Sequence, residues 1–189
     1  MTHKGTIYIV SGPSGCGKTT LCNHLLAKDK GIVESISVTT RRKRIGEKKN
    51  RDYVYVSEAE FKRRIKDNVF LEHACVFGNY YGTPKRFVVN NLDKGRDVLL
   101  IIDVRGAAQV KKAMKEAVLI AVLPPVFSAL EKRLRNRSSE GSADIKTRLM
   151  VAKEELRALK KYDYAVVNDS IARAVNCLSA IVLAHRCKI

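Results

Sequence analysis

The chain has 189 residues, enough for one domain with a sizeable core, and its 46% of hydrophobic residues is ordinary for a globular protein. Lys and Arg outnumber Asp and Glu by 36 to 19, a net charge of +17. This excess favours anionic partners, but charge alone does not separate a nucleotide enzyme from a nucleic-acid binder. No apolar run approaches the ~18 residues of a membrane span or forms a secretory signal, so we expect a cytoplasmic protein without membrane partners.

The first part of the chain predicts strands and helices in alternation. Thr6–Val10 predicts a short buried strand, and Lys18–Lys28 has the leucine spacing of a helix. Residues 35–40 and 53–56 predict two strands separated by a basic loop. The sequence Ser57-Glu-Ala-Glu60 is a capping box, which predicts a helix to about Asp67.

Proline and glycine punctuate the next helix. Thr83 and Pro84 can place a cap and a proline at its start, and Gly95 closes it. The apolar runs 98–102 and 118–123 predict strands buried on both faces, as in a parallel sheet covered by helices. The remaining predicted elements are helices at 105–116, 126–136, 143–161 and 170–186, and a strand at 164–167.

This alternation predicts an α/β fold with a parallel sheet flanked by helices. The segment at about 34–87 breaks the alternation and predicts a small inserted subdomain. Residues 136–143 are polar, and they predict either a mobile lid or a plain connector between helices.

A glycine-rich loop lies between the first predicted strand and helix. Residues 12–19 read Gly-Pro-Ser-Gly-Cys-Gly-Lys-Thr and match the pattern G-x-x-x-x-G-K-[ST]. Backbone N–H groups of such a loop turn toward phosphate oxygens, and the helix N-terminus adds its positive dipole end. Lys18 would reach the β- and γ-phosphates, and the Thr19 hydroxyl would bind Mg²⁺. The pattern predicts a P-loop NTPase-type nucleoside triphosphate site at Gly12, Pro13, Ser14, Gly15, Cys16, Gly17, Lys18, Thr19 and Thr20.

The five cysteines point to reduced thiols, because they are odd in number and scattered without a C-x-x-C pair. This spacing argues against a disulfide framework and against a zinc site. Cys16, in the glycine-rich loop, is either a reactive thiol near a helix N-terminus or a small filler side chain, and we favour the filler.

Asp103 follows the apolar run that ends at Ile102. A P-loop protein carries its metal-side acid at such a position, and a carboxylate that caps the next helix would suit the same place. With the glycine-rich loop upstream, we favour the metal-side acid.

Three further segments resemble guanylate kinases. Ser37-Val-Thr-Thr-Arg-Arg-Lys-Arg44, followed by Gly46-Glu47 and Asp52-Tyr53, resembles the GMP-phosphate segment of that family. Phe70-Leu-Glu-His-Ala74 with Gly78-Asn-Tyr-Tyr-Gly-Thr83 is similar to its guanine-binding segment, and Val166-Val-Asn-Asp169 to its strand and turn near the adenine. With the glycine-rich loop, these motifs extend from residue 12 to residue 169 in the family's order and spacing.

The resemblance implies that ATP, with Mg²⁺, phosphorylates GMP to GDP in purine nucleotide metabolism. It implies a core at 1–33 and 88–189, a GMP-binding subdomain at about 34–87 and a lid at about 136–147. For GMP, the resemblance implies phosphate ligands at Arg41, Arg44, Tyr53 and Tyr81, and residues that recognise guanine (guanine readers) at Ser37, Glu72 and Thr83. It implies that Asp103 contacts GMP and, with Thr19, the metal, and that Asn168 binds ATP. The catalytic cations that it implies are Lys18, Arg44, Arg137 and Arg148.

The chemistry of these residue types agrees with the resemblance. Guanine presents two adjacent donors, N1–H and N2–H₂, and the carboxylate of Glu72 offers two acceptors at a matching separation. Adenine has an acceptor at N1, which would face the carboxylate lone pairs, so such a site discriminates strongly. Planar, permanently charged arginines suit the dianionic phosphate of GMP.

Each residue taken alone also has a plainer interpretation. Glu72 suits a surface carboxylate, Arg41 and Arg44 a solvated basic turn, and Tyr81 a core or edge aromatic. Their order and spacing together favour the functional interpretation.

The chain departs from the family pattern at three places. Ile101 stands where an acid associated with the metal and GMP region is usual, so this carboxylate is not available to the metal. Asn50 replaces a glycine, and asparagine tolerates the left-handed backbone that such a turn needs. Arg105 replaces a glutamine, for which we have no physical account.

Two other classes of function are weighed against the enzyme. A nucleic-acid-binding P-loop protein would use the +17 charge, but no nucleic-acid motif is present, so we do not expect a nucleic-acid partner. A catalytically dead scaffold is disfavoured because Gly12, Gly17, Lys18 and Thr19 are all retained. We expect a monomer or a homodimer.

Overall fold

A computed structural model of the chain describes residues 4–137 and 142–188. The described chain forms two compact units. The first unit contains residues 4–7, 31–100 and 105–117, and the second contains residues 8–30, 101–104, 118–137 and 142–188. Part of the lid predicted at about 136–147 falls on residues 138–141, which lie outside the described residues.

The second unit is built on parallel strands with apolar side chains on both faces. β1 (Ile7–Ser11) pairs with β8 (Val118–Leu123), and β8 pairs with β9 (Tyr164–Val167). Every residue of β1 is buried, as expected for a strand covered on both faces. The strand predicted at 118–123 and that at 164–167 are both confirmed with the same bounds.

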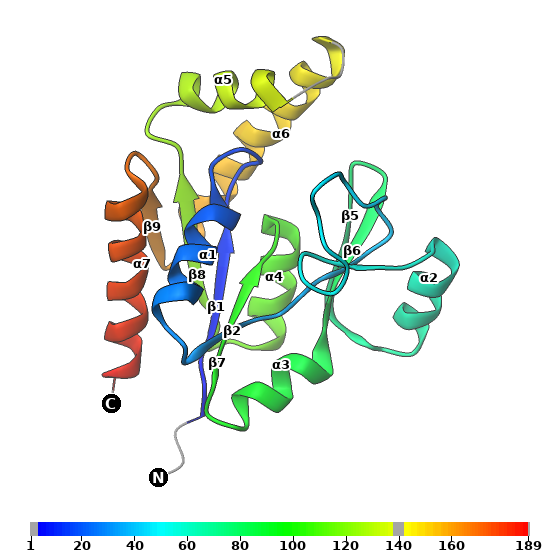
Figure 1. The fold of residues 1–189 in the computed structure, drawn as a ribbon, viewed down its shortest axis with the longest axis vertical. Helices are drawn as coiled ribbons and strands as arrows, with labels where there is room; N and C mark the ends of the chain where they lie inside the picture. The colour runs from blue at the N-terminus through cyan, green and yellow to red at the C-terminus, as the bar shows by residue number, and fades with distance from the viewer. Residues whose placement is uncertain (1–3, 138–141, 189) are drawn as a thin grey trace. The chain divides into compact units, whose positions relative to one another are not determined.

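Helices cover these strands. α1 (Lys18–Lys28) has the predicted bounds and packs against α7 (Ile171–Arg186), which also contacts β9 (Figure 1). α5 (Phe127–Arg137) packs against α6 (Ser142–Ala158), which continues into a 3₁₀ turn, η1 (Leu159–Lys161). No helix within the described ranges is long and apolar enough to cross a membrane.

The first unit contains a second set of parallel strands. β2 (Ile32–Glu34) pairs with β7 (Asp97–Ile101). The buried Asp97 carboxylate accepts a 2.8 Å hydrogen bond from the Thr6 amide, which satisfies a donor at the start of β1. α4 (Val104–Ala113) follows β7 and buries Ala107 and Val110.

Residues 38–84 of the first unit form a separate four-stranded sheet in the order β4-β3-β6-β5. Its strands are β3 (Val38–Thr39), β4 (Val54–Tyr55), β5 (Phe70–Val76) and β6 (Asn79–Pro84). The strands predicted at 35–40 and 53–56 are therefore shorter than expected. β5 and β6 form an antiparallel hairpin, and its turn at Phe77 and Gly78 has positive φ angles of 48° and 73°.

Two helices of the first unit differ from the sequence prediction in how they begin. α2 (Glu58–Lys66) starts at Ser57, whose hydroxyl accepts the Glu60 amide at 3.2 Å, so this half of the capping box is confirmed. The Glu60 carboxylate does not complete the box, because it pairs with Arg63 and Arg64.

The predicted cap at Thr83 is wrong. α3 (Lys85–Leu92) is preceded by Pro84 and has no side-chain cap. The Thr83 hydroxyl is not available to the helix, because it donates to Glu72 in the neighbouring strand. The predicted end is confirmed, since Gly95 takes a φ of 71° and its amide bonds to the Leu92 carbonyl.

Candidate nucleotide-binding sites

The glycine-rich loop of the second unit connects β1 to α1. The amide of Cys16 bonds to the Pro13 carbonyl at 3.2 Å, which closes the loop, and Gly17 stands at the N-cap of α1. Gly17 has a φ of 93°, a backbone conformation that a residue with a Cβ adopts only under strain. The loop therefore delivers the free amides of a helix N-terminus to one place, which is the arrangement that binds phosphate.

Lys18 folds back over its own loop. Its ammonium donates to the carbonyl of Gly12 at 2.5 Å and to that of Pro13 at 3.0 Å. Thr19 and Thr20, next along α1, are exposed, as is Ser14 in the loop. A cation and hydroxyls thus lie at the start of the helix.

Asn168 supports the loop from the end of β9. Its side-chain amide is buried and donates a 2.7 Å hydrogen bond to the Cys16 carbonyl. A Cβ added to Gly17 would collide with Nδ2 of Asn168. The resemblance implies that Asn168 binds ATP. In this structure the Asn168 side chain contacts the backbone of the glycine-rich loop.

Cys16 is fully buried, and burial raises the pKa of its thiol, against the opposing influence of Lys18. Within the described residues all five cysteines are free thiols. The buried, protonated Cys16 agrees with the filler interpretation and not with a reactive thiol.

Asp103 lies half-buried just after β7, in the part of that loop belonging to the second unit. Ser11, at the end of β1, donates its hydroxyl to the Ile102 carbonyl at 2.8 Å and approaches that of Asp103 at 3.5 Å. Burial raises the pKa of Tyr162 to about 12, and the charges of Asp103 and Glu155 add to this rise. The end of β1, Asp103 and Tyr162 therefore lie close together.

The guanine readers predicted in the first unit lie on the four-stranded sheet. Glu72 on β5 pairs with Thr83 on β6, and the Thr83 hydroxyl donates to Glu72 Oε1 at 2.6 Å. Both side chains are buried, with Glu72 4% exposed and Thr83 fully enclosed. Ser37 precedes β3, and continuing the pairing of Val38 with Gly82 by one residue sets it opposite Thr83. The sheet brings these three residues into one row.

A side chain outside the predicted site fixes the backbone beside Glu72. Gln109 on α4 accepts the His73 amide at 3.3 Å and donates to the His73 carbonyl at 2.9 Å. This reciprocal pair holds β5 at the residue next to the carboxylate. Sequence reasoning missed Gln109, because nothing in the chain order marks the contact, which spans 36 residues.

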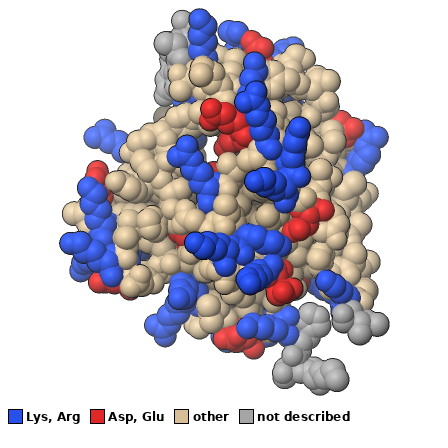
Figure 2. Space-filling model, turned by 180° about the vertical axis from the view of Figure 1, so that it is seen from behind, with Lys and Arg blue, Asp and Glu red and all other residues tan. Residues whose placement is uncertain are grey.

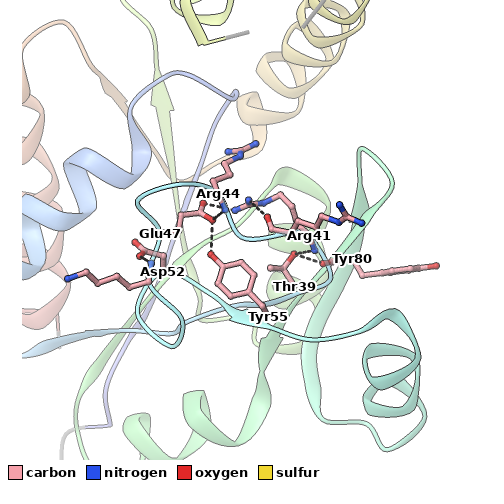
Figure 3. Close-up of polar contacts among 9 residues, drawn as sticks. Thr39, Arg41, Arg44, Glu47, Asp52, Tyr55 and Tyr80 are labelled. Carbon is pink, nitrogen blue, oxygen red and sulfur yellow. Dashed lines mark hydrogen bonds and ion pairs between the residues drawn. The ribbon is translucent and has the colours of Figure 1, made fainter. Parts of the chain in front are cut away.

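Three of the predicted ligands of the GMP phosphate, Arg41, Tyr53 and Tyr81, form a second cluster. The Arg41 guanidinium lies 5.3 Å from the centre of the Tyr53 ring, and the Tyr53 ring meets the Tyr81 ring edge-on at 6.0 Å. Burial raises the pKa of Tyr53, as does the neighbouring Tyr81. The Thr39 hydroxyl accepts the Arg41 amide at 3.1 Å and donates to the Tyr80 carbonyl at 2.9 Å, so β6 fixes the start of the basic loop (Figure 3).

Glu47 joins several parts of this basic loop. Its Oε1 accepts from Arg41 at 2.6 Å, and its Oε2 accepts from the Arg44 amide at 2.8 Å and from the Tyr55 hydroxyl at 2.7 Å (Figure 3). Burial acts to raise the pKa of Glu47, but these hydrogen bonds outweigh it and lower the pKa to about 2. Burial and the bond to Glu47 raise the pKa of Tyr55 to about 12.

The basic loop contains a turn at residues 48–52, and Asn50 lies in the middle of this turn. Its φ of 62° is the left-handed conformation expected for a residue that replaces glycine. Asp52 closes this turn by accepting the Lys48 amide at 2.6 Å. Lys48, Lys49 and Arg51 adjoin Asn50 in the sequence. Figure 2 shows Lys and Arg side chains spread over one face of the molecule, with Asp and Glu among them.

Two of the predicted catalytic cations, Arg137 and Arg148, are described only in part. Arg148 lies half-buried on α6. Arg137 is the last residue of α5, and its side chain lies outside the described part of the structure.

The donor set for a metal is small. In residues 4–137 and 142–188 no three His, Cys, Asp or Glu side chains gather into a group that could hold a metal ion. The Thr19 hydroxyl and the Asp103 carboxylate are oxygen donors of the kind that Mg²⁺ accepts. They fit a Mg²⁺ that is held chiefly by substrate phosphates and water.

A glycine-rich loop that leads from a buried parallel strand into a helix, with lysine and threonine at the helix start, defines a P-loop nucleotide-binding protein. The family model described as guanylate kinase matches residues 4–185. The chain therefore belongs to the guanylate kinase family.

Individual relatives agree with this assignment. The chain is 45% identical to a guanylate kinase of Caldanaerobacter subterraneus, over 98% of this chain and 90% of the relative. It is 46% identical to one of Syntrophomonas wolfei, over all of this chain and 97% of the relative. The crystal structure of guanylate kinase from Anaplasma phagocytophilum superposes with a TM-score of 0.85 at 37% identity, covering 99% of this chain and 89% of that one. The predicted α/β fold and the predicted family are both confirmed.

Proposed function

We propose that the chain transfers the γ-phosphate of ATP to GMP and so forms ADP and GDP, in purine nucleotide metabolism. Membership of the guanylate kinase family supports this reaction. The observation that carries the choice of GMP is the buried pair of Glu72 and Thr83. The guanine edge presents two adjacent donors that a carboxylate can accept, and hydrogen bonds to a buried carboxylate are strong.

The domain organisation that we propose follows the reaction. A core at 1–33 and 88–189 binds ATP, a subdomain at about 34–87 binds GMP, and a lid at about 136–147 covers the transferring phosphate. The four-stranded sheet at residues 38–84, which carries the guanine readers, supports the proposed bounds of the subdomain.

ATP would bind along the loop from Gly12 to Thr20. Backbone amides at the start of α1 meet phosphate oxygens, and the ammonium of Lys18 exchanges the carbonyls of Gly12 and Pro13 for the β- and γ-phosphates. Asn168 keeps the loop in shape through the Cys16 carbonyl. Thr19 and Asp103 would hold Mg²⁺, which neutralises phosphate charge when it is bound.

GMP would bind through both ends. Glu72 accepts N1–H and N2–H₂ of guanine, with Thr83 and Ser37 beside it, and Arg41, Arg44, Tyr53 and Tyr81 hold the phosphate. An oxygen of the GMP phosphate then attacks the γ-phosphorus while the bond from that phosphorus to the β–γ bridging oxygen breaks.

No general base is needed, because the attacking oxygen is already anionic near neutral pH. Catalysis is positioning and charge neutralisation, for which Lys18, Arg44, Arg137 and Arg148 provide the cations. Closure of the lid and the GMP subdomain would exclude water and limit hydrolysis of ATP.

A coupled assay of ADP release tests the proposal. With ATP and Mg²⁺ present, GMP, AMP, CMP and UMP are offered in turn. Rapid turnover is expected with GMP alone. Equal turnover with AMP would contradict the role of Glu72. No turnover with any of the four nucleotides would contradict the reaction, and the absence of an acid at Ile101 would be the first explanation to test.

A further inference from the structure

Glu47 lies in the basic loop between β3 and β4, and the proposed reaction assigns this residue no role. We propose that Glu47 is a positioning residue for recognition of the GMP phosphate, because it holds Arg41 and the turn at 44–47 in a binding-ready arrangement. This inference rests on the proposed function, since it concerns the GMP half of that reaction.

The Glu47 carboxylate uses both of its oxygens on separate parts of the loop. Oε1 takes the Arg41 guanidinium, whereas Oε2 takes the Arg44 amide and the Tyr55 hydroxyl (Figure 3). These donors come from before the turn, from the turn and from β4. One side chain therefore fixes three points that the sequence separates by up to 14 residues, from Arg41 to Tyr55.

Arg41 is held from several directions. The carboxylate grips one Nη, the Arg42 carbonyl accepts from the other at 2.8 Å, and the Tyr53 ring lies against the guanidinium. Its backbone is fixed separately by Thr39. A long side chain that is ordered before the ligand arrives loses less conformational entropy when it binds.

Glu47 binds the side chain of Arg41 but only the backbone of Arg44. Only its backbone amide is bound, and the Glu47 amide in turn donates to the Arg44 carbonyl at 3.2 Å. Gly46, with a φ of 86°, permits this closed turn. Among the described residues, the Arg44 guanidinium makes no hydrogen bond or ion pair, and it remains available to an anion.

An anion beside a phosphate site has two possible effects, with opposite consequences. As a positioning residue, Glu47 improves GMP binding through the ordered arginines. As a competitor, it would occupy Arg41 in place of the phosphate, and its removal would tighten binding. The three simultaneous bonds favour positioning, because competition needs only the bond to Arg41.

The test is Glu47→Gln in the full chain, which keeps the size and one acceptor but removes the charge. We expect the Kd of GMP to rise about tenfold while the Kd of guanosine stays within about twofold, because only the phosphate end loses its ordered cations. In steady state the KM for GMP should rise, with kcat within about threefold and the KM for ATP unchanged. Glu58→Gln is the matched control, because Glu58 is an exposed carboxylate whose one ion pair within the described residues is with Lys62 on α2.

Several outcomes overturn the inference: an unchanged or lower Kd for GMP, or an equal loss of guanosine and GMP, which would mean a general structural role. If Glu47→Gln does not fold, Glu47→Asp retains the charge but cannot reach all three donors, and the same phosphate-selective loss is expected. A wild-type protein that does not turn over GMP would instead refute the proposed function.

Discussion

The Thr83 hydroxyl donates a 2.6 Å hydrogen bond to Oε1 of Glu72 across the β5–β6 pair, and both side chains are buried. A carboxylate has about four lone-pair sites, and the Thr83 hydroxyl uses one of them.

Glu72→Gln should therefore lower kcat/KM for GMP by at least about 100-fold, since an amide cannot accept both guanine donors. Thr83→Val should lower kcat/KM for GMP about tenfold, whereas Thr83→Ser, which keeps the hydroxyl, should have a kcat/KM near that of the wild type. Steady-state kinetics with GMP checks all three variants. Wild-type kinetics for Glu72→Gln would remove Glu72 from the site.

Lys18→Ala should reduce kcat about 100- to 1,000-fold, because a cation that neutralises transferring phosphates is lost. Thermal unfolding should change little, since the contacts that Lys18 makes are to the loop's own carbonyls. Lys30→Ala is the control, because Lys30 is exposed and, in the part of the chain that the structure describes, its one hydrogen bond is to the Leu26 carbonyl. Near-normal turnover of Lys18→Ala would contradict the proposed role.

The contact of Asn168 with the glycine-rich loop predicts a coupled pair of variants. Asn168→Ala should destabilise the protein by about 1–3 kcal/mol, because the buried Cys16 carbonyl loses its donor. Gly17→Ala should weaken ATP binding, since its backbone has a positive φ and its Cβ meets Asn168. Gly17→Ala should also lower the free energy of unfolding, and in the double variant the two losses measured by urea unfolding should be less than additive, because the added Cβ no longer meets the Asn168 side chain. Full additivity would mean that the two residues do not interact.

Cysteine labelling tests the burial of the loop thiol. Cys75, Cys177 and Cys187 are exposed and should react with a thiol reagent at once, whereas Cys16 and Cys22 should react only on unfolding. The raised pKa of Cys16 lowers its thiolate fraction at neutral pH and slows it further. Mass spectrometry of native and unfolded protein assigns the sites. Rapid labelling of Cys16 in the native protein would contradict this account of the loop.

The depressed pKa of Glu47 predicts a pH dependence of stability. Its folded pKa of about 2 lies below its ordinary value of 4.5, so the folded state binds this proton less readily than the unfolded state does. The contribution of the carboxylate is complete above pH 4.5 and is lost as the pH falls toward 2. The difference in free energy of unfolding between the wild type and Glu47→Gln should therefore be largest at pH 6. It should narrow progressively as the pH falls from about 4.5 toward 2. A gap of constant size would mean that the carboxylate is not held as described.

Local pattern was enough to predict the phosphate loop and α1. The spacing of glycines, Lys18 and Thr19 dictates the turn and the helix start, and α1 has the predicted bounds. Asn50 was also predictable, because few residues other than glycine tolerate its φ.

Long-range contacts were not predictable in this way. The cap at Thr83 failed because a strand partner took its hydroxyl. Gln109, like Glu47, becomes visible only when the register of β5 and the path of the basic loop are known. The Gly46-Glu47 pair carried a weak signal, but no periodicity indicates which donors a carboxylate will meet.

The pair between Gln109 and His73 has a consequence beyond the alignment of Glu72. β5 is the outermost strand of its sheet, and an outermost strand offers unused amides and carbonyls to any extended peptide. At His73 both of those groups are already taken by a side-chain amide. Because Gln109 satisfies both backbone groups of His73, this position of the edge strand offers no hydrogen bonds to an added strand, which disfavours edge-to-edge association there.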